Sequence, residues 1–362
     1  MSDFVLPGKI CLPWHPWLFV FLIVVLDFCS VKAQTQAGKV QFSGKRQYDT
    51  SYVQRYSDKI VAKLDVDSDV DQYLIQGSNF KYDIRPNAGV SKLLSFNYRY
   101  AYLAVSYLPS IIAPNRLNDQ RGETSGFGVG TGLSTPRLVA DISYKKVKGF
   151  YLHNTGDVDP GWDSSSDPYI QFPEMKTWMI RGVMLYKVNP NYSVRAIQTQ
   201  TEAQRKSATS LIPGIASTYY VIDNQSASSS SSQKSNTLEV LAELNYYGTL
   251  VINHRLYFSA GLGAGAGMYH TWLLTRQPTG NIGSTQSNSI FRGIGNAGLG
   301  YNANRFIAGA EILHYQSFSS QPNDVVQMKF TRTAFQVFIG YRFKPPRFIE
   351  KTMDGLDHLF SF

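Results

Sequence analysis

The sequence contains only two cysteines, Cys11 and Cys29, and both lie within its first 33 residues. The chain that follows has no disulfide, no thiolate nucleophile and no cysteine-ligated metal to explain. After Leu26 no stretch is apolar enough for a membrane-spanning helix. Metal-ligand spacings, phosphate-binding loops and Gly-x-Ser-x-Gly elbows are also missing from the sequence. The sequence therefore predicts no cofactor, no metal site and no catalytic residues.

The first residues of the chain have the pattern of an export signal. Trp17–Leu26 is apolar throughout, but it is much shorter than the about 20 residues that a membrane-spanning helix needs. A small-residue cleavage pattern follows at Val31-Lys32-Ala33. We expect a secretory signal peptide over residues 1–33, with an uncleaved anchor as the alternative. Because the chain is exported, we expect no nucleic-acid partner despite its formal net charge of +9.

The most regular feature of the remaining chain is an alternation of apolar and polar residues. Between Leu238 and Ile252 nearly every second residue is apolar, and Glu239, Glu243 and Asn245 stand among the others. A period of two predicts a strand with one apolar and one polar face. Similar segments recur along the chain, which is rich in Tyr, Phe and Gly. With the export signal, they predict an all-β protein: a closed antiparallel transmembrane barrel in the outer membrane of a Gram-negative bacterium.

The expected strands number twelve, an even count as in bacterial single-chain barrels. They are Lys59–Val66, Asn79–Asn87, Lys92–Tyr107, Thr124–Ser134, Arg137–Tyr151, Lys176–Val188, Tyr192–Ile222, Thr237–Ile252, Arg255–Thr275, Ser289–Tyr301, Arg305–Phe318 and Val326–Phe343. Tyr192–Ile222 is interpreted as one long, bent strand, with a hairpin near Arg205 as the alternative. Short and long connections then alternate, with long loops such as Arg276–Asn288 outside the cell and both termini in the periplasm.

The expected barrel covers residues 58–343. Residues 34–57 form a periplasmic N-terminal segment, and residues 344–362 form a periplasmic C-terminal tail. Pro345-Pro346 separates this tail from the last strand, because proline cannot continue the ladder of hydrogen bonds.

In such a barrel the apolar parity of each strand contacts outer-membrane lipid and the polar parity faces the lumen. This rule places inside the lumen Arg99, Asp141, Lys145, Arg181, Lys187, Arg195, Glu239, Glu243, Arg292, Arg305, Glu311, Arg332 and Arg342. Basic side chains outnumber acidic ones in this set, so the lumen is expected to attract anionic solutes. The expected solute-binding residues are Arg99, Arg181, Arg195, Arg292, Arg305 and Arg332. The alternative is that these charges pair and close the lumen.

Two further patterns have both a functional and a structural interpretation. Gly261, Gly263, Gly265 and Gly267 share the luminal parity of one strand, where they leave room for a ligand or for large side chains that face them. Aspartates also recur in two expected loops, near residues 65–71 and 157–167. The calcium loop of the Asp-x-Asp-x-Asp-Gly type is absent, so we interpret them as solvated loop acids, with weak divalent-cation binding as the alternative.

Three passages carry a resemblance to a known family. They are Tyr48–Val53, Gln204–Ser207 and Gly340–Phe343. Together they resemble an uncharacterised family of Bacteroidota, described only as a domain of unknown function and taken to be outer-membrane β-barrels. The resemblance implies a fold and a location but no activity. Gly340, Tyr341 and Phe343 also resemble the C-terminal signal that the barrel-assembly machinery reads, which makes that machinery an expected partner.

The function expected from the sequence is passage or binding of a small, possibly anionic, solute through the lumen. One alternative is a structural or adhesive barrel with a closed lumen. A second is an outer-membrane lipid hydrolase, because His270 and His314 fall on the lipid-facing parity. Four serines lie near them in the sequence: Ser289, Ser317, Ser319 and Ser320. Only geometry can identify a serine–histidine pair, so an enzyme is not the leading expectation.

Overall fold

The computed structural model describes residues 49–77, 79–87, 91–108, 117–225, 232–319 and 326–360. The expected signal peptide, residues 34–48 of the expected N-terminal segment and the serine-rich stretch 226–231 lie outside this part of the chain. Within the described residues, no helix is both long and apolar enough to cross a membrane.

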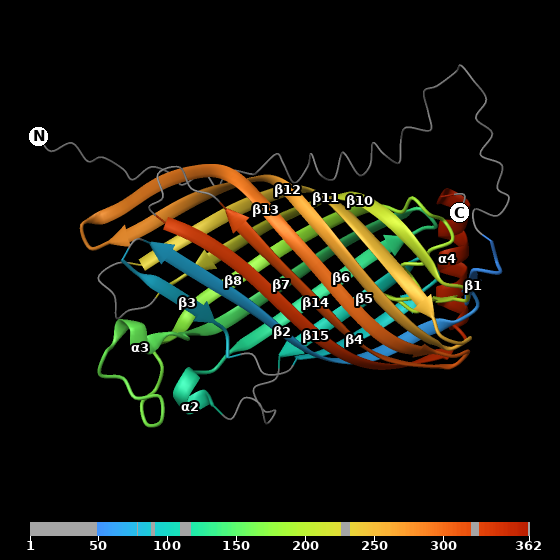
Figure 1. Ribbon diagram of the computed structural model, residues 1–362, viewed down its shortest axis with the longest axis horizontal. Helices are drawn as coiled ribbons and strands as arrows, with labels where there is room; N and C mark the ends of the chain where they lie inside the picture. Colours follow the sequence, from blue (N-terminus) through green and yellow to red (C-terminus); the bar gives the residue numbers. More distant parts are fainter. Residues whose placement is uncertain are drawn as a thin grey trace, which may run out of the picture. The chain divides into compact units, whose positions relative to one another are not determined.

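Within these residues, twelve antiparallel strands close into a barrel when the last strand pairs with the first along its whole length (Figure 1). The strands are β2 (Ile60–Gly77), β4 (Ser91–Tyr98), β5 (Ala101–Leu108), β6 (Ser125–Ser134), β7 (Leu138–Leu152), β8 (Gln171–Tyr186), β10 (Ala208–Asp223), β11 (Ser232–Val251), β12 (Leu256–Gln277), β13 (Gly280–Asn302), β14 (Phe306–Ser319) and β15 (Val326–Phe343). The predicted all-β class and the closed antiparallel barrel of twelve strands are confirmed.

The predicted number of strands is correct, although two strands near the start of the barrel were assigned wrongly. Asn79–Asn87 contains only the short strand β3 (Lys81–Arg85), which bridges β2 and β7 beyond the ends of β4, β5 and β6. Lys92–Tyr107 is not one strand but the hairpin of β4 and β5. The two errors cancel in the count.

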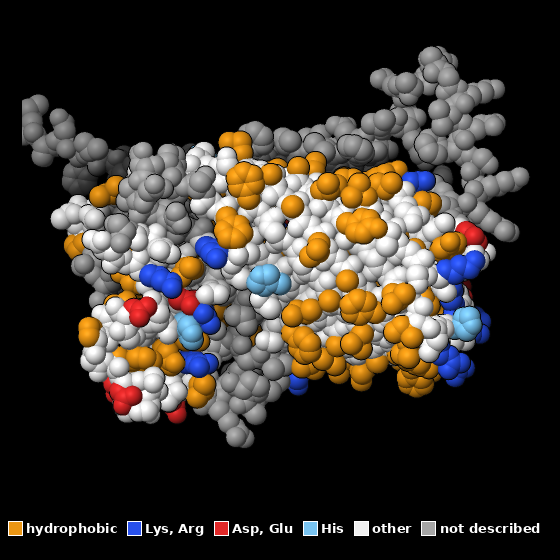
Figure 2. All heavy atoms as spheres, in the orientation of Figure 1, with side chains coloured by type: hydrophobic (Ala, Val, Ile, Leu, Met, Phe, Trp, Pro, Cys, Tyr) orange, Lys and Arg blue, Asp and Glu red, His pale blue; other side chains and the backbone are white. Residues whose placement is uncertain are grey.

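The predicted alternation of apolar and polar faces is confirmed along β11. Its outward residues are well exposed, with Leu244 at 52%, whereas inward Leu241 is fully buried. Figure 2 shows hydrophobic side chains over the middle of the visible outer wall and charged side chains gathered near its two ends. Such an apolar band between polar ends is what a membrane-spanning barrel requires.

The two ends of the barrel differ in their connections. At the end that holds the start of β2 and the end of β15, here called the short-turn end, tight turns join most strands. The opposite, long-loop end holds the short helices α2 (Asn118–Arg121) and α3 (Thr155–Val158). The expected loop Arg276–Asn288 is wrong, because β12 and β13 pair as far as Gln277 and Gly280.

One long connection breaks the pattern at the short-turn end. Residues 187–207, between β8 and β10, are mostly turns and are largely buried; we call them the plug. The interpretation of Tyr192–Ile222 as one strand is therefore wrong, since only Ala208–Asp223 runs along the wall. Within the plug, the three-residue strand β9 (Glu202–Gln204) pairs with β1 (Val53–Arg55) in a separate small sheet.

The end of the chain is helical. After β15 ends at Phe343, helix α4 (Arg347–Phe360) packs Met353 against Ile60 and Tyr98 at the short-turn end. An ion pair of 2.7 Å between Asp354 and Arg99, in the β4–β5 turn, holds the helix there. The predicted end of the last strand is confirmed, and the described part of the expected tail is an amphipathic helix docked on the barrel.

Candidate functional site

The three passages that carry the family resemblance meet at the plug. Val53 of the first passage is the strand partner of Gln204 of the second. The side chain of Gln204 accepts a hydrogen bond from the backbone N–H of Ser193 and donates to the carbonyl oxygens of Tyr52 and Asn191. One glutamine therefore ties together the N-terminal segment and both ends of the plug.

The third passage reaches the plug through Arg342. Its Nε donates to the carbonyl oxygen of Gln200 at 3.1 Å, and a second nitrogen donates to Asn302 Oδ1 at 2.6 Å. The guanidinium also lies 3.9 Å from the ring centroid of Tyr56. Arg342 is almost completely buried, so it fastens the plug to the last strand through bonds that are shielded from water.

The centre of the plug is a buried ion-pair network around Glu202. Arg195 contacts this carboxylate at 2.5 Å and Arg55 contacts it at 3.4 Å. The hydroxyl of Ser193 donates to its other oxygen at 2.5 Å. Arg195 was predicted to project from the wall into the lumen, and this placement is wrong because Arg195 belongs to the plug itself.

Lys187 is a second buried cation of the plug, and its ammonium group donates to the carbonyl oxygen of Tyr192. Burial lowers the pKa of Lys187 to about 8; attraction from Glu202 opposes this shift and repulsion from Arg195 adds to it. The plug is therefore held partly by a group whose charge changes at mildly alkaline pH.

Beyond the plug, the lumen is crossed by a network of paired charges on the inner wall. Arg292 of β13 contacts Glu239 at 2.7 Å and Glu243 at 3.8 Å, and the side chains of all three are almost fully buried. Arg181 of β8 approaches Glu243 at 4.0 Å from the other side. The predicted luminal positions of Arg181, Arg292, Glu239 and Glu243 are confirmed.

An aromatic ring organises the arginines of this network. Tyr315 of β14 is buried, and its ring centroid lies 5.0 Å from the Arg292 guanidinium. Arg332 and Arg181 lie 5.9 and 6.0 Å from the same ring. Cations over the face of a tyrosine are stabilised by the ring quadrupole. Tyr315 therefore allows three like charges from three strands to gather on one side of the lumen.

Acidic residues that were assigned to a loop complete this wall. Asp65 and Asp71 lie on the inner face of β2, where both are buried. Lys145 contacts Asp71 at 2.7 Å, and Arg332 lies 4.0 Å from it. The interpretation of Asp65–Asp71 as solvated loop acids is wrong. Their period-two spacing was the signal for a luminal strand face.

These aspartates also correct the expected charge of the lumen. Two of the expected luminal arginines are absent from the inner wall, since Arg99 lies in the β4–β5 turn and Arg305 is exposed in the β13–β14 turn. The acidic residues of β2 add negative charge to the inner wall that was not expected. The described inner wall therefore carries paired charges of both signs, and the expectation of a mainly basic lumen is wrong.

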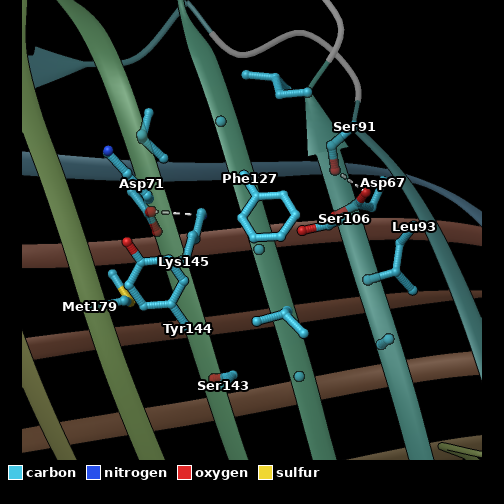
Figure 3. Close-up of a pocket in the computed structure, with 18 of the residues that line it drawn as sticks. Asp67, Asp71, Ser91, Leu93, Ser106, Phe127, Ser143, Tyr144, Lys145 and Met179 are labelled. Atoms are coloured by element: carbon cyan, nitrogen blue, oxygen red, sulfur yellow. Dashed lines mark hydrogen bonds and ion pairs between the residues drawn. The ribbon is translucent and has the colours of Figure 1, made fainter.

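A cavity of about 330 Å³ lies in the lumen beside this network, along strands β4 to β8 (Figure 3). Small inward residues leave the space: Gly126, Gly128, Gly130, Ala104, Ser106 and Ser143. At Gly130 an added Cβ would meet no atom closer than 3.7 Å. Ligand pockets span roughly 300–1,000 Å³, so the cavity can hold a small molecule.

The lining of this cavity has an apolar part and a charged part. Leu93, Leu108, Val147, Phe150 and Met179 supply apolar surface. The charged part consists of Asp67, Asp71, Lys145, Arg181 and Arg332, and Figure 3 shows Lys145 bonded to Asp71 and Ser91 bonded to Asp67. The Nε of Arg181 is buried and makes no hydrogen bond within the described residues. It is a donor that a ligand in the cavity can satisfy.

The glycine stripe of β12 leaves room for large side chains, which was one of the two interpretations of its sequence. Asn245 and Tyr247 of the neighbouring strand β11 lie directly over Gly263 and Gly261. An added Cβ at Gly263 would lie 2.0 Å from Asn245 Oδ1. The stripe accommodates large neighbouring side chains. The glycines that border the cavity lie on β6 and were not singled out in the sequence.

The histidines and serines of the hydrolase alternative, and the aspartates of the second loop, make mostly local contacts. His270 Nδ1 lies 2.5 Å from Ser287 Oγ, whereas His314 bonds to Thr333. Ser317 faces inward and bonds to Arg292. Asp163 accepts hydrogen bonds from Ser165 within its own loop, and no group of three or more potential metal ligands occurs in the described part of the chain. Ser320 lies outside that part.

Comparison with known proteins shows the family. Residues 47–343 match the model of a domain of unknown function, DUF4421, and the chain belongs to this family. No match was found among curated proteins.

The chain is also similar to several solved structures of bacterial proteins. The outer membrane protease OmpT of Escherichia coli is 8% identical, with 83% of this chain and 100% of that chain covered and a TM-score of 0.39. The toluene transporter TodX of Pseudomonas putida is 9% identical, with coverages of 78% and 88% and a TM-score of 0.27. Ail of Yersinia pestis is 11% identical, with coverages of 78% and 98% and a TM-score of 0.20. At this level of similarity neither activity nor substrate transfers to this chain.

Proposed function

We propose that this chain is an outer-membrane barrel of a Gram-negative bacterium that binds a small amphipathic anion in the luminal cavity. The observation that carries the proposal is a cavity with apolar surface on one part and three cations, Lys145, Arg181 and Arg332, against two acids, Asp67 and Asp71, on another. The unpaired Nε of Arg181 favours a ligand that accepts hydrogen bonds. A Bacteroidota origin rests on the family resemblance alone.

The plug sets the route of the solute in this proposal. It contacts Lys63, Asn302 and Arg342 at the short-turn end, whereas the cavity lies nearer the long-loop end. A solute therefore enters from the outside and stays bound above the plug. Passage onward requires the plug to move. While the plug stays in place, the lumen is closed, as in the alternative function expected from the sequence.

Hexanoate binding tests the proposal, with hexylammonium and hexanol as probes of the charge requirement. We expect saturation-transfer NMR on the protein in lipid nanodiscs to detect hexanoate in preference to both. Gly130→Leu fills the cavity and should abolish the signal, and Arg181→Gln should weaken it. Ser217→Leu, on the lipid-facing side of β10, is the matched control. Equal signals for the three probes, or an unchanged signal in Gly130→Leu, contradict the proposal.

Planar-bilayer recording tests the closed state. The wild-type protein should show no discrete conductance steps, because the plug is fixed by buried ion pairs and hydrogen bonds. A variant in which residues 192–203 are replaced by a short glycine-serine linker should conduct. Frequent steps in the wild type would show that the plug does not close the barrel.

One contact favours a second candidate function, lipid hydrolysis. His270 and Ser287 face each other across β12 and β13 on the outward side, and their 2.5 Å contact brings a candidate nucleophile within hydrogen-bond reach of a candidate general base. Ser287 should then react with a fluorophosphonate probe. Labelling should disappear in Ser287→Ala and in His270→Gln but persist in Ser289→Ala. An unlabelled wild-type protein removes this candidate.

Recognition by the barrel-assembly machinery remains a proposal that rests on the end of β15. Tyr341 and Phe343 are exposed on the outer wall, and Gly340, directly before Tyr341, faces inward. Phe343→Ala should lower the fraction of heat-modifiable, membrane-inserted protein in cells. Phe348→Ala, a change of an exposed phenylalanine on α4, is the control. Equal insertion of the two variants contradicts this role.

A further inference from the structure

A second hollow lies on the lipid-facing side of the wall, near the short-turn end. It has a volume of about 750 Å³ and lies over β10, β11 and β12. Its floor includes a row of small residues at one level, because Gly248 and Ala260, which both line it, pair across β11 and β12. We call this hollow the outer groove. It is separate from the luminal cavity and from the His270–Ser287 contact.

Two ridges of large apolar side chains border the row. Tyr246 and Leu262 pair on one side of it, and Leu250 and Phe258 pair on the other. All four are well exposed, with Leu262 at 74%. Because barrel strands tilt roughly 35–45° to the membrane normal, a groove across them is also inclined rather than flat in the membrane plane. A hydrocarbon chain that lies in the groove is therefore tilted away from the membrane normal but need not lie flat in the membrane plane.

One end of the outer groove opens beside basic residues. Ser207 and Thr209 line the groove, and Lys206, which precedes them, is exposed at the rim, where its ammonium group also donates to Ser51 Oγ at 2.9 Å. Arg205 donates to the carbonyl oxygen of His254 at 2.6 Å, which holds its guanidinium at the adjacent β11–β12 turn. Exposed Arg255 follows in the same turn.

We propose that the outer groove binds one molecule of an anionic glycerophospholipid from the membrane leaflet at the short-turn end. One acyl chain lies between the two ridges over Gly248 and Ala260. The phosphate is held at the rim by Lys206, Arg205 and Arg255. Charge complementarity identifies this occupant: an apolar partner protein or a second copy of the barrel has no need of a cationic end, whereas a phosphate does. The proposal depends on membrane insertion but not on solute binding in the lumen.

The test uses the full chain reconstituted with equal amounts of phosphatidylglycerol and phosphatidylcholine, followed by native mass spectrometry of the released protein. We expect one retained lipid, with phosphatidylglycerol preferred by roughly tenfold or more, since each basic group near an anionic lipid contributes appreciably. Ala260→Phe fills the groove and should remove the retained lipid. Ala310→Phe is the matched control, because Ala310 faces lipid on β14, a strand that does not line the groove.

Variants at the rim distinguish binding of the lipid headgroup from binding of its acyl chain. Arg255→Gln with Lys206→Gln should abolish the preference for phosphatidylglycerol while one lipid is still retained. Arg305→Gln, in the next turn, is the control and should keep the preference. Equal retention of the two lipids by the wild type overturns the proposal, as does undiminished retention in Ala260→Phe. A lipid-free dimer that Ala260→Phe dissociates would show that a second copy covers the groove instead.

Discussion

Arg342, the penultimate residue of the barrel's final strand, donates a 3.1 Å hydrogen bond to the backbone carbonyl of Gln200 in the plug. This bond joins residues far apart in the sequence and both side chains are buried. The same guanidinium binds Asn302 of β13 and stacks on Tyr56 of the N-terminal segment. The last strand, the plug and the N-terminal segment therefore meet at one side chain.

Replacing Arg342 should loosen the plug more than the barrel. Arg342→Met keeps much of the side-chain volume but leaves buried acceptors without donors, which costs on the order of 3 kcal/mol. We expect proteolytic cleavage within residues 192–203 while the barrel stays heat-modifiable, and discrete conductance steps that the wild type lacks. Arg305→Met removes an exposed arginine from the neighbouring turn and serves as the control. A plug that resists protease equally in both variants contradicts this role.

The plug should become more stable as the pH rises from about 8. Burial lowers the pKa of Lys187 to about 8, so between this value and its ordinary value the unfolded chain holds more protons than the folded one. The unfolding free energy therefore increases with pH across that window, by on the order of 3 kcal/mol if Lys187 alone titrates. Below pH 8 the contribution is absent, because both states are protonated.

The measurement is the protease resistance of the plug at pH 7.5 and at pH 10, for the wild type and for Lys187→Met. At each pH, cleavage of the plug is compared with cleavage of an unfolded reference substrate by the same protease. On this scale the wild type should gain resistance at the higher pH, and the variant should not. An equal gain in both proteins would assign the effect to other groups.

The glycine stripe of β12 should tolerate no side chain where β11 covers it. Gly263→Ala places a methyl group 2.0 Å from Asn245 Oδ1, and Asn245 is fully buried. Overpacking of this kind costs about 1–3 kcal/mol. Gly293→Ala, on the lipid-facing side of β13, has no atom within 4 Å of the added group and should be neutral. Urea-induced unfolding in lipid vesicles compares the two. Equal midpoints would mean that Asn245 moves without cost.

Much of this fold could be predicted from the sequence, because lipid on one side of the wall and polar groups on the other impose a period of two. The pattern in Leu238–Ile252 predicted β11 and its outward face correctly. It also predicted the luminal positions of Arg181, Arg292 and Arg332, since parity is all that their placement requires.

The plug could not be predicted in the same way. Residues 187–207 fold back against the wall, and tertiary contacts rather than periodicity bury them, so the segment was assigned to a strand. The prediction for the luminal acids of β2 was wrong for a different reason. Asp65–Asp71 has the period of a strand, but its density of charge resembled a solvated loop. Val66 and Ser68 alternate with these aspartates along the strand, and this period of two was the stronger signal.

The charge network across the lumen yields a last prediction, through Arg292. Its side chain is only 3% exposed, and it pairs with Glu239 at 2.7 Å and donates to Ser317 at 2.8 Å. Arg292→Met leaves Glu239 and Glu243 buried without their nearest cation, and breaking a buried pair in this way costs about 3–5 kcal/mol. The barrel should unfold at clearly lower urea concentration. If the loss arises from the uncompensated carboxylates, Glu239→Gln in the Arg292→Met background should restore part of the stability, although Glu239→Gln alone destabilises the wild type. Two losses that simply add would mean that the two residues act independently, despite their contact.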